Sequence, residues 1–422
     1  MDRSQYKERI NMVIDERREE AIKLLSEFIK RPTDNPPSDT RALVAFIANL
    51  LKEKGISYQV HEIKETNQNI VAVLEGVGKG KDSRNLVLNG HLDQFPAGDL
   101  KTWDFDPYCG DVVDGKILGR GAGDMKGGSA SLLFSFLLMK ELSIPLGGQL
   151  TLMLVADEES GGQYGTEWLL NNREEIRGTA MLNGEDTGAH LIRAGEKGKH
   201  WFKVKVRSMA GHGGLGRKKT AITRMAEVVL AFSTEVAGIP GRVPEELHDV
   251  MEFSRKMLDD EFGPGTGAIV DHTSVNVGII SGGIKINILP GECEAHVDVR
   301  VPLGVTPEQV AERVEGVLRK YSEEYQVELI NSFPANYTSP SSEILQILKR
   351  NAAAITKKEP HFWFTYTCTD ARFFRERNIP VGMVGPAVYN MGGPNEYIYA
   401  DEYIDVIKIH SNAIVDYLNP IL

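Results

Sequence analysis

The stretch LVLNGHLDQFP (residues 86–96) opens as a continuous apolar run and closes on a histidine and an aspartate two positions apart, His91 and Asp93. Such a run is typical of a strand buried on both faces of a parallel sheet. Because side chains at i and i+2 face the same way in extended chain, both groups can point to one side of the strand's mouth. On this stretch alone, a satisfied polar pair at a strand end is the favoured interpretation.

Helical and strand patterns alternate on both sides of this stretch. Helices are expected at 9–29, 39–54 and 129–142, and strands at 56–63, 69–74, 86–89 and 151–156. This alternation predicts an α/β sheet covered by helices on both faces. Ligands of such sheets gather beyond the carboxyl ends of the strands.

The pattern changes near residue 200, where FKVKVR (202–207) alternates between apolar and basic residues, as a half-exposed strand does. A helix at 220–232, strands in HTSVNVGII and CEAHVDVR, a helix at 307–321 and a strand at 327–330 follow. This order resembles a ferredoxin-like (βαββαβ) module, inserted at 200–334 between two segments of a catalytic domain, 1–199 and 335–422. A helix at 343–354, a strand at 380–384 and a helix at 402–417 complete the α/β pattern, and the glycine-rich segment 261–267 is expected to be a surface loop.

Composition argues against several classes of function. The chain has 422 residues, enough for two or three domains, and 59 acidic against 48 basic side chains give a net charge of −11. That balance argues against general nucleic-acid binding. The longest apolar run, around SLLFSFLLM, is far below the roughly 18 residues of a membrane span, and the charged N-terminus does not resemble a signal peptide. Three widely spaced cysteines suggest no disulfide framework, so a reducing cytoplasm is expected.

Acidic side chains follow three further strands or turns of the predicted sheet. They are Asp124 in ILGRGAGDMKGG (117–128), Glu158 and Glu159 in VADEESGG (155–162), and Glu185 in MLNGEDTG (181–188). Adjacent carboxylates repel one another, so several at one sheet edge imply a nearby cation or full solvation. Imidazole and carboxylate ligands without cysteine suit zinc, and also cobalt or manganese.

The glycine-rich turn around Asp124 also admits a phosphate-binding loop, because helix N-termini attract anions. Neither G-x-G-x-x-G nor a Walker pattern is present, however, and an aspartate would repel phosphate. An enzyme that binds ATP or NAD through this turn is therefore an alternative with weaker support.

Taken in order, GHLDQFP, GRGAGDMKGG, DEESGG and NGEDTG resemble the co-catalytic zinc amidohydrolases and exopeptidases that include acetylornithine deacetylase, succinyl-diaminopimelate desuccinylase and carboxypeptidase G-type enzymes. The resemblance continues through MAGHGG, GGIKINILPGECEAHVDVRVP, CTDARFF and GGPNEYI, and so covers nearly the whole chain. It implies a metallopeptidase-type α/β catalytic domain, an inserted module that serves as a lid and dimerisation domain, and hence a homodimer.

The resemblance also implies a role for each residue of these motifs. The metal ligands would be His91 and Glu185 on one ion, Glu159 on a second, and Asp124 as a bridge between the two. Glu158 would act as the general base on the attacking water, and Asp93 would orient His91. Two divalent ions about 4 Å apart would acidify a shared water and polarise the amide carbonyl.

One motif departs from the family pattern. The last motif usually begins with a histidine, four residues before its glutamate, that completes the shell of the second metal. Here the segment reads YNMGGPNEYI and the position is Gly392. An extra water, another ligand such as Asn395, weak binding of the second ion, or a single-ion enzyme would each be compatible with this change. His361 and His410 are the nearest other imidazoles, and His410 falls within a helical pattern.

The same resemblance places four residues at the substrate. His212 in MAGHGG would stabilise the oxyanion, in the family often in the partner subunit's site. Asn287 and Arg300 match positions near the substrate, and Arg372 in CTDARFF can grip a carboxylate with two hydrogen bonds. His212 can also be an ordinary loop histidine, and Arg300 a surface charge at the end of its strand. Asp370 is expected to orient its loop.

These observations predict a metal-dependent hydrolase, with one or two zinc ions per chain, that cleaves an amide or peptide bond in a small substrate with a free carboxylate, such as an N-acyl amino acid or a dipeptide. The alternative from another class is a catalytically impaired metal- or ligand-binding homologue, suggested by Gly392. Neither a nucleic acid nor a membrane is expected as a partner.

Overall fold

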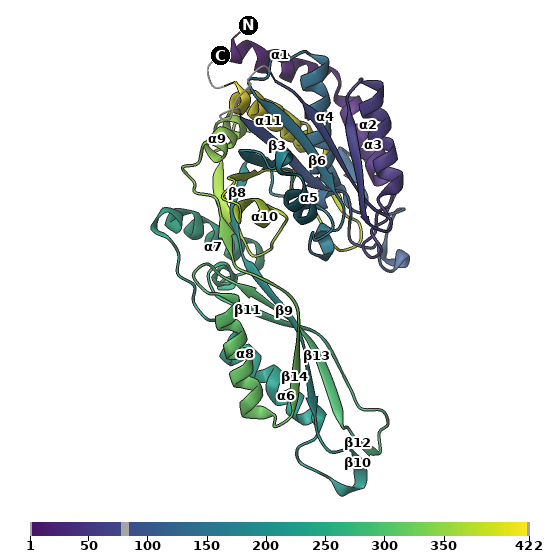
Figure 1. The fold of residues 1–422 in the computed structure, drawn as a ribbon, viewed down its shortest axis with the longest axis vertical. Helices are drawn as coiled ribbons and strands as arrows, with labels where there is room; N and C mark the ends of the chain where they lie inside the picture. Colours follow the sequence, from purple (N-terminus) through teal and green to yellow (C-terminus); the bar gives the residue numbers. More distant parts are fainter. Residues whose placement is uncertain (1, 77–83, 420–422) are drawn as a thin grey trace. The chain divides into compact units, whose positions relative to one another are not determined.

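The computed structural model describes residues 2–76 and 84–419, and the chain forms two compact units (Figure 1). The first unit consists of Met1–Ala194, Thr338–Phe362 and Thr369–Leu422, and the second of Gly195–Tyr337 and Trp363–Cys368. None of the helices in the described part of the chain has the length and hydropathy of a membrane span.

The first unit is built on a sheet whose centre is parallel. In spatial order its strands are β1 (Tyr58–Lys64), β2 (Asn67–Leu74), β6 (Gln149–Val155), β3 (Asn85–His91), β7 (Ala180–Asn183), β17 (Val381–Met383) and β8 (Leu191–Glu196), and β16 (His361–Thr365) also pairs with β8. The last two residues of β8 belong to the second unit, where they pair with β15 (Asn336–Tyr337). The four central strands, β6, β3, β7 and β17, run parallel. β3 is buried from its second residue onward, as a strand with helices on both faces must be.

Helices pack on both faces of this sheet. On one face lie α4 (Gly128–Glu141), α9 (Glu343–Thr356) and α11 (Ala400–Leu418), with α3 (Arg41–Glu53) on β1 and β2. On the other face, α5 (Thr166–Asn172) and α10 (Ala371–Arg375) share an apolar core with the strands. α4 is buried along nearly its whole length, which explains why its sequence is apolar on every side. The α/β class predicted from the sequence is confirmed.

One helix prediction in this unit is wrong. In place of a single helix at 9–29, the chain forms α1 (Arg3–Glu16) and α2 (Arg18–Ile29). The break is at Arg17, whose φ of −102° and ψ of 22° are not helical. The Arg17 guanidinium pairs with Glu141 at the end of α4, so a contact far away in sequence accompanies the break.

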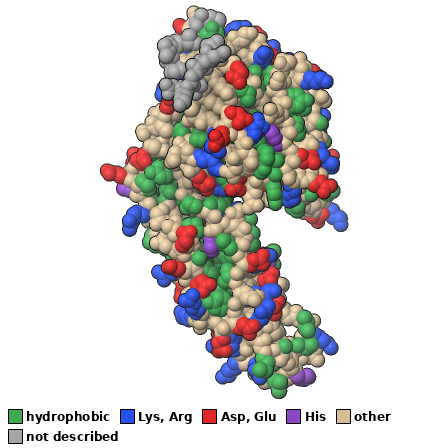
Figure 2. Space-filling view, in the orientation of Figure 1, with side chains coloured by type: hydrophobic (Ala, Val, Ile, Leu, Met, Phe, Trp, Pro, Cys, Tyr) green, Lys and Arg blue, Asp and Glu red, His purple; other side chains and the backbone are tan. Residues whose placement is uncertain are grey.

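The second unit is an antiparallel sheet with helices on one face. Its strands lie in the order β11 (Ser274–Gly282), β13 (Glu292–Val301), β9 (Gly198–Arg207) and β14 (Tyr325–Phe333). α6 (Ala221–Ala231) and α8 (Pro307–Tyr321) cover the apolar face, where Phe202, Val204 and Val206 of β9 are buried. The residues between them in β9 are more exposed, so FKVKVR is the half-exposed strand predicted from its alternation. Acidic and basic side chains are interspersed over the face of this unit drawn in Figure 2.

The second unit also contains a helix that was not predicted from the sequence, α7 (His248–Phe262). Its buried residues Val250, Ser254 and Leu258 are four positions apart, as on one face of a helix. The serine interrupts the apolar pattern by which such a face is recognised in a sequence. The glycine-rich segment 261–267 begins at the end of this helix, and Gly263 and Gly265 adopt φ values of 103° and 91° that favour glycine.

Candidate metal centre

Three adjacent parallel strands deliver three of the four predicted metal ligands and the predicted base to one edge of the sheet. β3 lies between β6 and β7, and its last residue, His91, is in register with Val155 at the end of β6. Asn89 of β3 is in register with Asn183 at the end of β7. Because all three strands end together, the segments that follow them, 92–93, 156–159 and 184–186, meet beyond the carboxyl edge where ligands of α/β sheets bind.

The ring of His91 is oriented by its own chain. Its Nδ1 lies 2.9 Å from the main-chain carbonyl oxygen of Asp93, so Nδ1 carries a hydrogen and donates it. The other ring nitrogen, Nε2, faces carboxylates: Asp124 Oδ1 at 3.1 Å and Glu185 Oε1 at 3.5 Å. A neutral imidazole in this tautomer would present a lone pair to two acceptors, an arrangement that suits a cation between them.

Glu159 brings a further carboxylate to the same point. One ligand atom from each of His91, Asp124 and Glu159 lies within 4.8 Å of the other two. The Oε1 atom of Glu159 is buried and accepts no hydrogen bond from any described residue. A buried anionic oxygen without a donor is costly unless a cation compensates it. The donor set therefore fits a divalent metal ion.

The electrostatics of the cluster lead to the same conclusion. Burial and nearby carboxylates raise the pKa values of Glu158 and Glu159 well above their usual range. Burial alone would lower the pKa of His91, but hydrogen bonds with Asp124, Asp93 and Glu185 outweigh that effect and raise it. The cluster thus gathers more negative charge than its single imidazole balances.

The Asp93 carboxylate does not make the closest contact with His91. The role of Asp93 in orienting His91 stays a prediction: the carboxylate Oδ1 lies 3.5 Å from Nδ1, and the main-chain carbonyl of the same residue lies nearer, at 2.9 Å. The two carboxylate oxygens also accept the main-chain N–H groups of Glu158 and Glu159, each at 3.2 Å. Asp93 therefore connects the end of β3 to the turn that carries both glutamates.

Asp124 is held in place by a close approach of two glycines. It lies in the turn η2 (Ala122–Gly127), directly before α4, and α4 begins at Gly128. A Cβ atom on Gly128 would lie 1.8 Å from the main-chain oxygen of Gly184, the residue before Glu185. Only glycine at position 128 allows the α4 start to reach the end of β7, and this contact brings Asp124 and Glu185 to the same imidazole.

The segment around Gly392 is anchored by Arg120. Gly392 has a φ of 71°, a conformation that favours glycine, and its carbonyl accepts a hydrogen bond from Arg120 at 3.1 Å. The same guanidinium forms a buried ion pair with Glu396. The side-chain amide of Asn395, considered above as a replacement ligand, forms two hydrogen bonds with Asp104. Its Nδ2 donates to the Asp104 carboxylate at 2.7 Å, and its Oδ1 accepts from the Asp104 main-chain N–H at 2.8 Å.

The residues predicted at the substrate are divided between the two units. Arg372 belongs to the first unit, is buried, and donates to the main-chain carbonyls of Gly161 at 2.5 Å and Thr369 at 2.9 Å. Asp370, two residues earlier, is also buried, and burial raises its pKa to about 6. The roles expected of these two residues stay predictions.

The other three predicted substrate residues belong to the second unit, where His212 and Asn287 lie near one another and Arg300 lies on a different strand. His212 is in β10 (Gly211–His212), which pairs with β12 (Ile288–Leu289), and the Gly213 N–H donates to the Asn287 carbonyl at 2.8 Å. Arg300, near the end of β13, donates to Asp298 at 2.9 Å and contacts the Cys368 sulfur at 3.4 Å. Their roles at a substrate also stay predictions.

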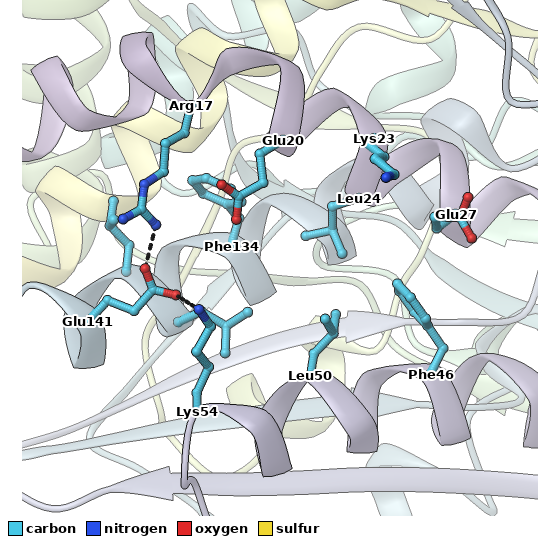
Figure 3. Close-up of a pocket in the computed structure, with 12 residues that line it drawn as sticks. Arg17, Glu20, Lys23, Leu24, Glu27, Phe46, Leu50, Lys54, Phe134 and Glu141 are labelled. Atoms are coloured by element: carbon cyan, nitrogen blue, oxygen red, sulfur yellow. Dashed lines mark hydrogen bonds and ion pairs between the residues drawn. The ribbon is translucent and has the colours of Figure 1, made fainter.

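A separate apolar cavity of about 450 Å³ lies among α2, α3 and α4 (Figure 3). Leu24, Leu50 and Phe134 contribute to its lining, and at one end Glu141 accepts hydrogen bonds from Arg17 and Lys54. None of the site residues predicted from the sequence lines this cavity, so it is distinct from the metal centre.

The chain is similar to known proteins along most of its length. The sequence profile of peptidase family M20/M25/M40 matches residues 87–416. The chain is 25% identical to N-formyl-4-amino-5-aminomethyl-2-methylpyrimidine deformylase of Bacillus subtilis (strain 168), with 96% of each chain covered. It is 27% identical to a succinyl-diaminopimelate desuccinylase of Rhodospirillum centenum, over 93% of this chain and 96% of that one. A family M20 metallo-carboxypeptidase from Sulfolobus solfataricus, 18% identical, has the same fold, with a TM-score of 0.79 over 96% of this chain and 100% of that chain.

Proposed function

The chain belongs to peptidase family M20/M25/M40 and is a hydrolase acting on carbon–nitrogen bonds, and we propose that it releases an acyl group or an amino acid from a small substrate that carries a free carboxylate. The observation that carries this proposal is the convergence of Asp124 and Glu185 on the Nε2 atom of His91, with Glu159 within reach and Glu158 beside it in sequence. An N-acyl amino acid and a dipeptide are the two substrate classes that fit.

In the proposed mechanism, His91, Asp124, Glu159 and Glu185 hold the metal. A divalent ion bound there supplies Lewis acidity, which polarises the substrate carbonyl and acidifies water. Glu158 takes a proton from the attacking water as the new carbon–oxygen bond forms, and passes it to the leaving nitrogen as the carbon–nitrogen bond breaks. His212 would stabilise the negative charge on the carbonyl oxygen.

At the other end of the substrate, Arg300 and Arg372 are the proposed partners of the carboxylate, since a guanidinium can offer two parallel N–H donors. Asn287 would hydrogen-bond the substrate near the scissile bond. Arg372 would have to exchange its contacts with Gly161 and Thr369 for the ligand. The acyl group and the amine would be set by the remaining lining of the site.

We propose zinc as the metal, with cobalt or manganese as functional substitutes, because one imidazole and several carboxylates suit all three ions. Gly392 offers no side chain, and Asn395 is engaged by Asp104. These observations favour one tightly bound ion at His91, Asp124 and Glu185. A second ion, at Asp124 and Glu159, would bind more weakly and keep more water.

The central test is a panel of N-acyl amino acids and dipeptides assayed with added zinc, cobalt or manganese. We expect hydrolysis of at least one member, and we expect Glu158→Gln to reduce kcat by a factor of about 10³ or more while the metal content stays at the wild-type value. The glutamine keeps the shape of the side chain and removes the base. Unchanged turnover in the variant would refute the role of Glu158.

The alternative, an impaired homologue that binds metal or ligand without turnover, is favoured by one observation, the glycine at position 392. It predicts bound metal by elemental analysis and no hydrolysis of any substrate with any of the three ions. Activity with a single ion per chain would exclude it and would establish a mononuclear enzyme.

The assembly and location of the protein are further parts of the proposal. A homodimer, in which His212 would serve the site of the partner subunit, is expected from the family resemblance and can be tested by sedimentation equilibrium. A reducing cytoplasm is the proposed location, because the three cysteines are odd in number and widely spaced in the sequence.

A further inference from the structure

The segment RPTDNPP (31–37) places an amide side chain, which was not predicted as a site residue, against Asp93 of the metal centre. Asn35 Nδ2 donates to Asp93 Oδ2 at 2.7 Å. We propose that Asn35 is a positioning residue: it fixes the Asp93 carboxylate and, through it, the turn that carries Glu158 and Glu159. The catalytic part of this inference rests on the proposed function, because it needs Glu158 as the base.

The Asp93 carboxylate is fully buried, and each of its oxygens accepts a main-chain hydrogen bond. Oδ1 accepts the main-chain N–H of Glu158 and Oδ2 that of Glu159, both at 3.2 Å. Rotation of the carboxylate about χ2 would break both contacts at once. The contact from Asn35 is the shortest of the three, so it is the one that best resists this rotation.

Asn35 also reaches the turn directly. The same Nδ2 atom lies 3.2 Å from Ser160 Oγ, and the Ser160 hydroxyl donates to the main-chain carbonyl of Asp157 at 3.3 Å. Asn35 thus connects the end of β3 with the far end of the turn that begins at Asp157. This second contact is longer than the first and uses a neutral acceptor, so it contributes less.

The backbone around Asn35 is fixed independently of its side chain. The Asn35 N–H donates to the carbonyl of Gln94 at 2.9 Å, and Thr33 Oγ1 donates to the carbonyl of Leu92 at 2.6 Å. A substitution of the side chain alone leaves these contacts intact. Asn35→Asp therefore tests the donor: the shape is preserved, while a carboxylate oxygen replaces the N–H that faces Asp93.

The first readout is hydrogen exchange of the Glu158 and Glu159 amides in metal-free protein, which requires neither a substrate nor a metal. We expect both amides to exchange at least tenfold faster in Asn35→Asp than in wild type, because loss of a hydrogen bond to a charged group is worth about one to two orders of magnitude in an equilibrium. Asn35→Ala, which adds no charge, is measured in parallel and decides the question if Asn35→Asp does not fold.

The second readout is steady-state kinetics of the metal-loaded enzyme. At metal concentrations that saturate the variant, we expect kcat to fall by about 10- to 100-fold with KM within threefold of wild type, because Asn35 acts on the base through Asp93 and is not proposed to contact the substrate. Ser160→Ala is the matched control, because it removes the longer contact of Asn35 and the hydrogen bond from Ser160 to the Asp157 carbonyl but leaves the contact between Asn35 and Asp93 in place. We expect its exchange rates and kcat to stay within threefold of wild type.

Wild-type exchange rates at Glu158 and Glu159 in the Asn35 variants would overturn the proposal, and so would an unchanged kcat. If the wild-type enzyme hydrolyses no substrate, the proposed function fails, and the exchange rates alone still decide whether Asn35 holds the turn. The two failures are therefore distinguishable.

Discussion

At the scale of single residues, His410 shows how burial fixes the protonation state of an imidazole. It lies within α11 and is fully buried. Ser131 Oγ lies 2.8 Å from Nδ1, and Nε2 lies 2.7 Å from the main-chain carbonyl of Val384. The carbonyl can only accept, so Nε2 carries the hydrogen and Nδ1 accepts from the serine hydroxyl. Both nitrogens are used by the neutral ring, which explains why this histidine is not a metal ligand in the fold.

His410 predicts a specific pH dependence of stability. Burial lowers its pKa to about 4, whereas in the unfolded chain it titrates near pH 6.5. Between these values the unfolded chain binds the proton and the folded chain does not. The contribution of His410 to stability is therefore complete above pH 6.5 and is lost as the pH falls, by about 3 kcal/mol at pH 4.

Urea unfolding of wild type and His410→Gln at several pH values between 7 and 4 measures this contribution. We expect the free energy of unfolding to fall less steeply in the variant, whatever its stability at pH 7, because glutamine does not titrate. Parallel curves for the two proteins would show that another group causes the acid sensitivity.

The clustering of the site residues could be predicted from the sequence, but their contacts with residues far away in the chain could not. The position of His91 after an apolar strand, and the acidic residues after neighbouring strands, predicted a cluster at one sheet edge, because parallel strands end together. The pairing of Asn35 with Asp93 was not predictable, since it joins residues 58 positions apart and no periodicity marks it. The engagement of Asn395 by Asp104 likewise depends on a contact across 291 positions.

At the scale of elements, the metal centre depends on how closely α4 approaches β7. Twelve of the fourteen residues of α4 are buried, from Gly128 to Met139, so the helix cannot shift without disturbing the core. Its first residue, Gly128, is in van der Waals contact range of Gly184 only because it has no Cβ. Asp124 precedes this contact by four residues, and Glu185 follows it by one.

Gly128→Ala should therefore separate two proposed ligands without altering either. The added Cβ would meet main-chain atoms, which cannot move aside as a flexible side chain would. We expect metal affinity, measured by competition with a chromophoric chelator, to fall by at least tenfold. Gly316→Ala is the control: Gly316 lies within α8 with no atom near its Cβ position, so alanine should stabilise the helix by up to about 1 kcal/mol and leave metal affinity unchanged. Equal affinities in all three proteins would contradict the argument.

Elements with strong local patterns were predicted, and those with weak patterns were not. α8 lies at its predicted bounds, and its local pattern is strong: a threonine capping box precedes it and its buried valines are spaced as on one helix face. The break at Arg17 was missed because the charged run around it keeps helical propensity on both sides, and only its contact with Glu141 distinguishes it. α7 was missed because its buried face includes Ser254, whose hydroxyl donates to the carbonyl of Val250.

At the scale of the whole molecule, the proposed metal ligands are confined to one unit. His91, Asp124, Glu159 and Glu185 all belong to the first unit, whereas the second has a core of its own around β9, β13, α6 and α8. A ligand that binds only the folded form stabilises the part of the protein that forms its site. Metal binding should therefore act on the two units unequally.

Hydrogen exchange of the metal-free chain with and without zinc provides the test. We expect slower exchange in the segments that carry the ligands, 91–93, 122–128, 156–160 and 184–186, and no change in β9, β13 or β14. At free zinc 100-fold above its dissociation constant, the stabilisation should reach about 2.7 kcal/mol and should disappear when a chelator is added. Protection that spreads equally through the second-unit strands would mean that this unit also holds the metal, and the ligand set proposed here would then be incomplete.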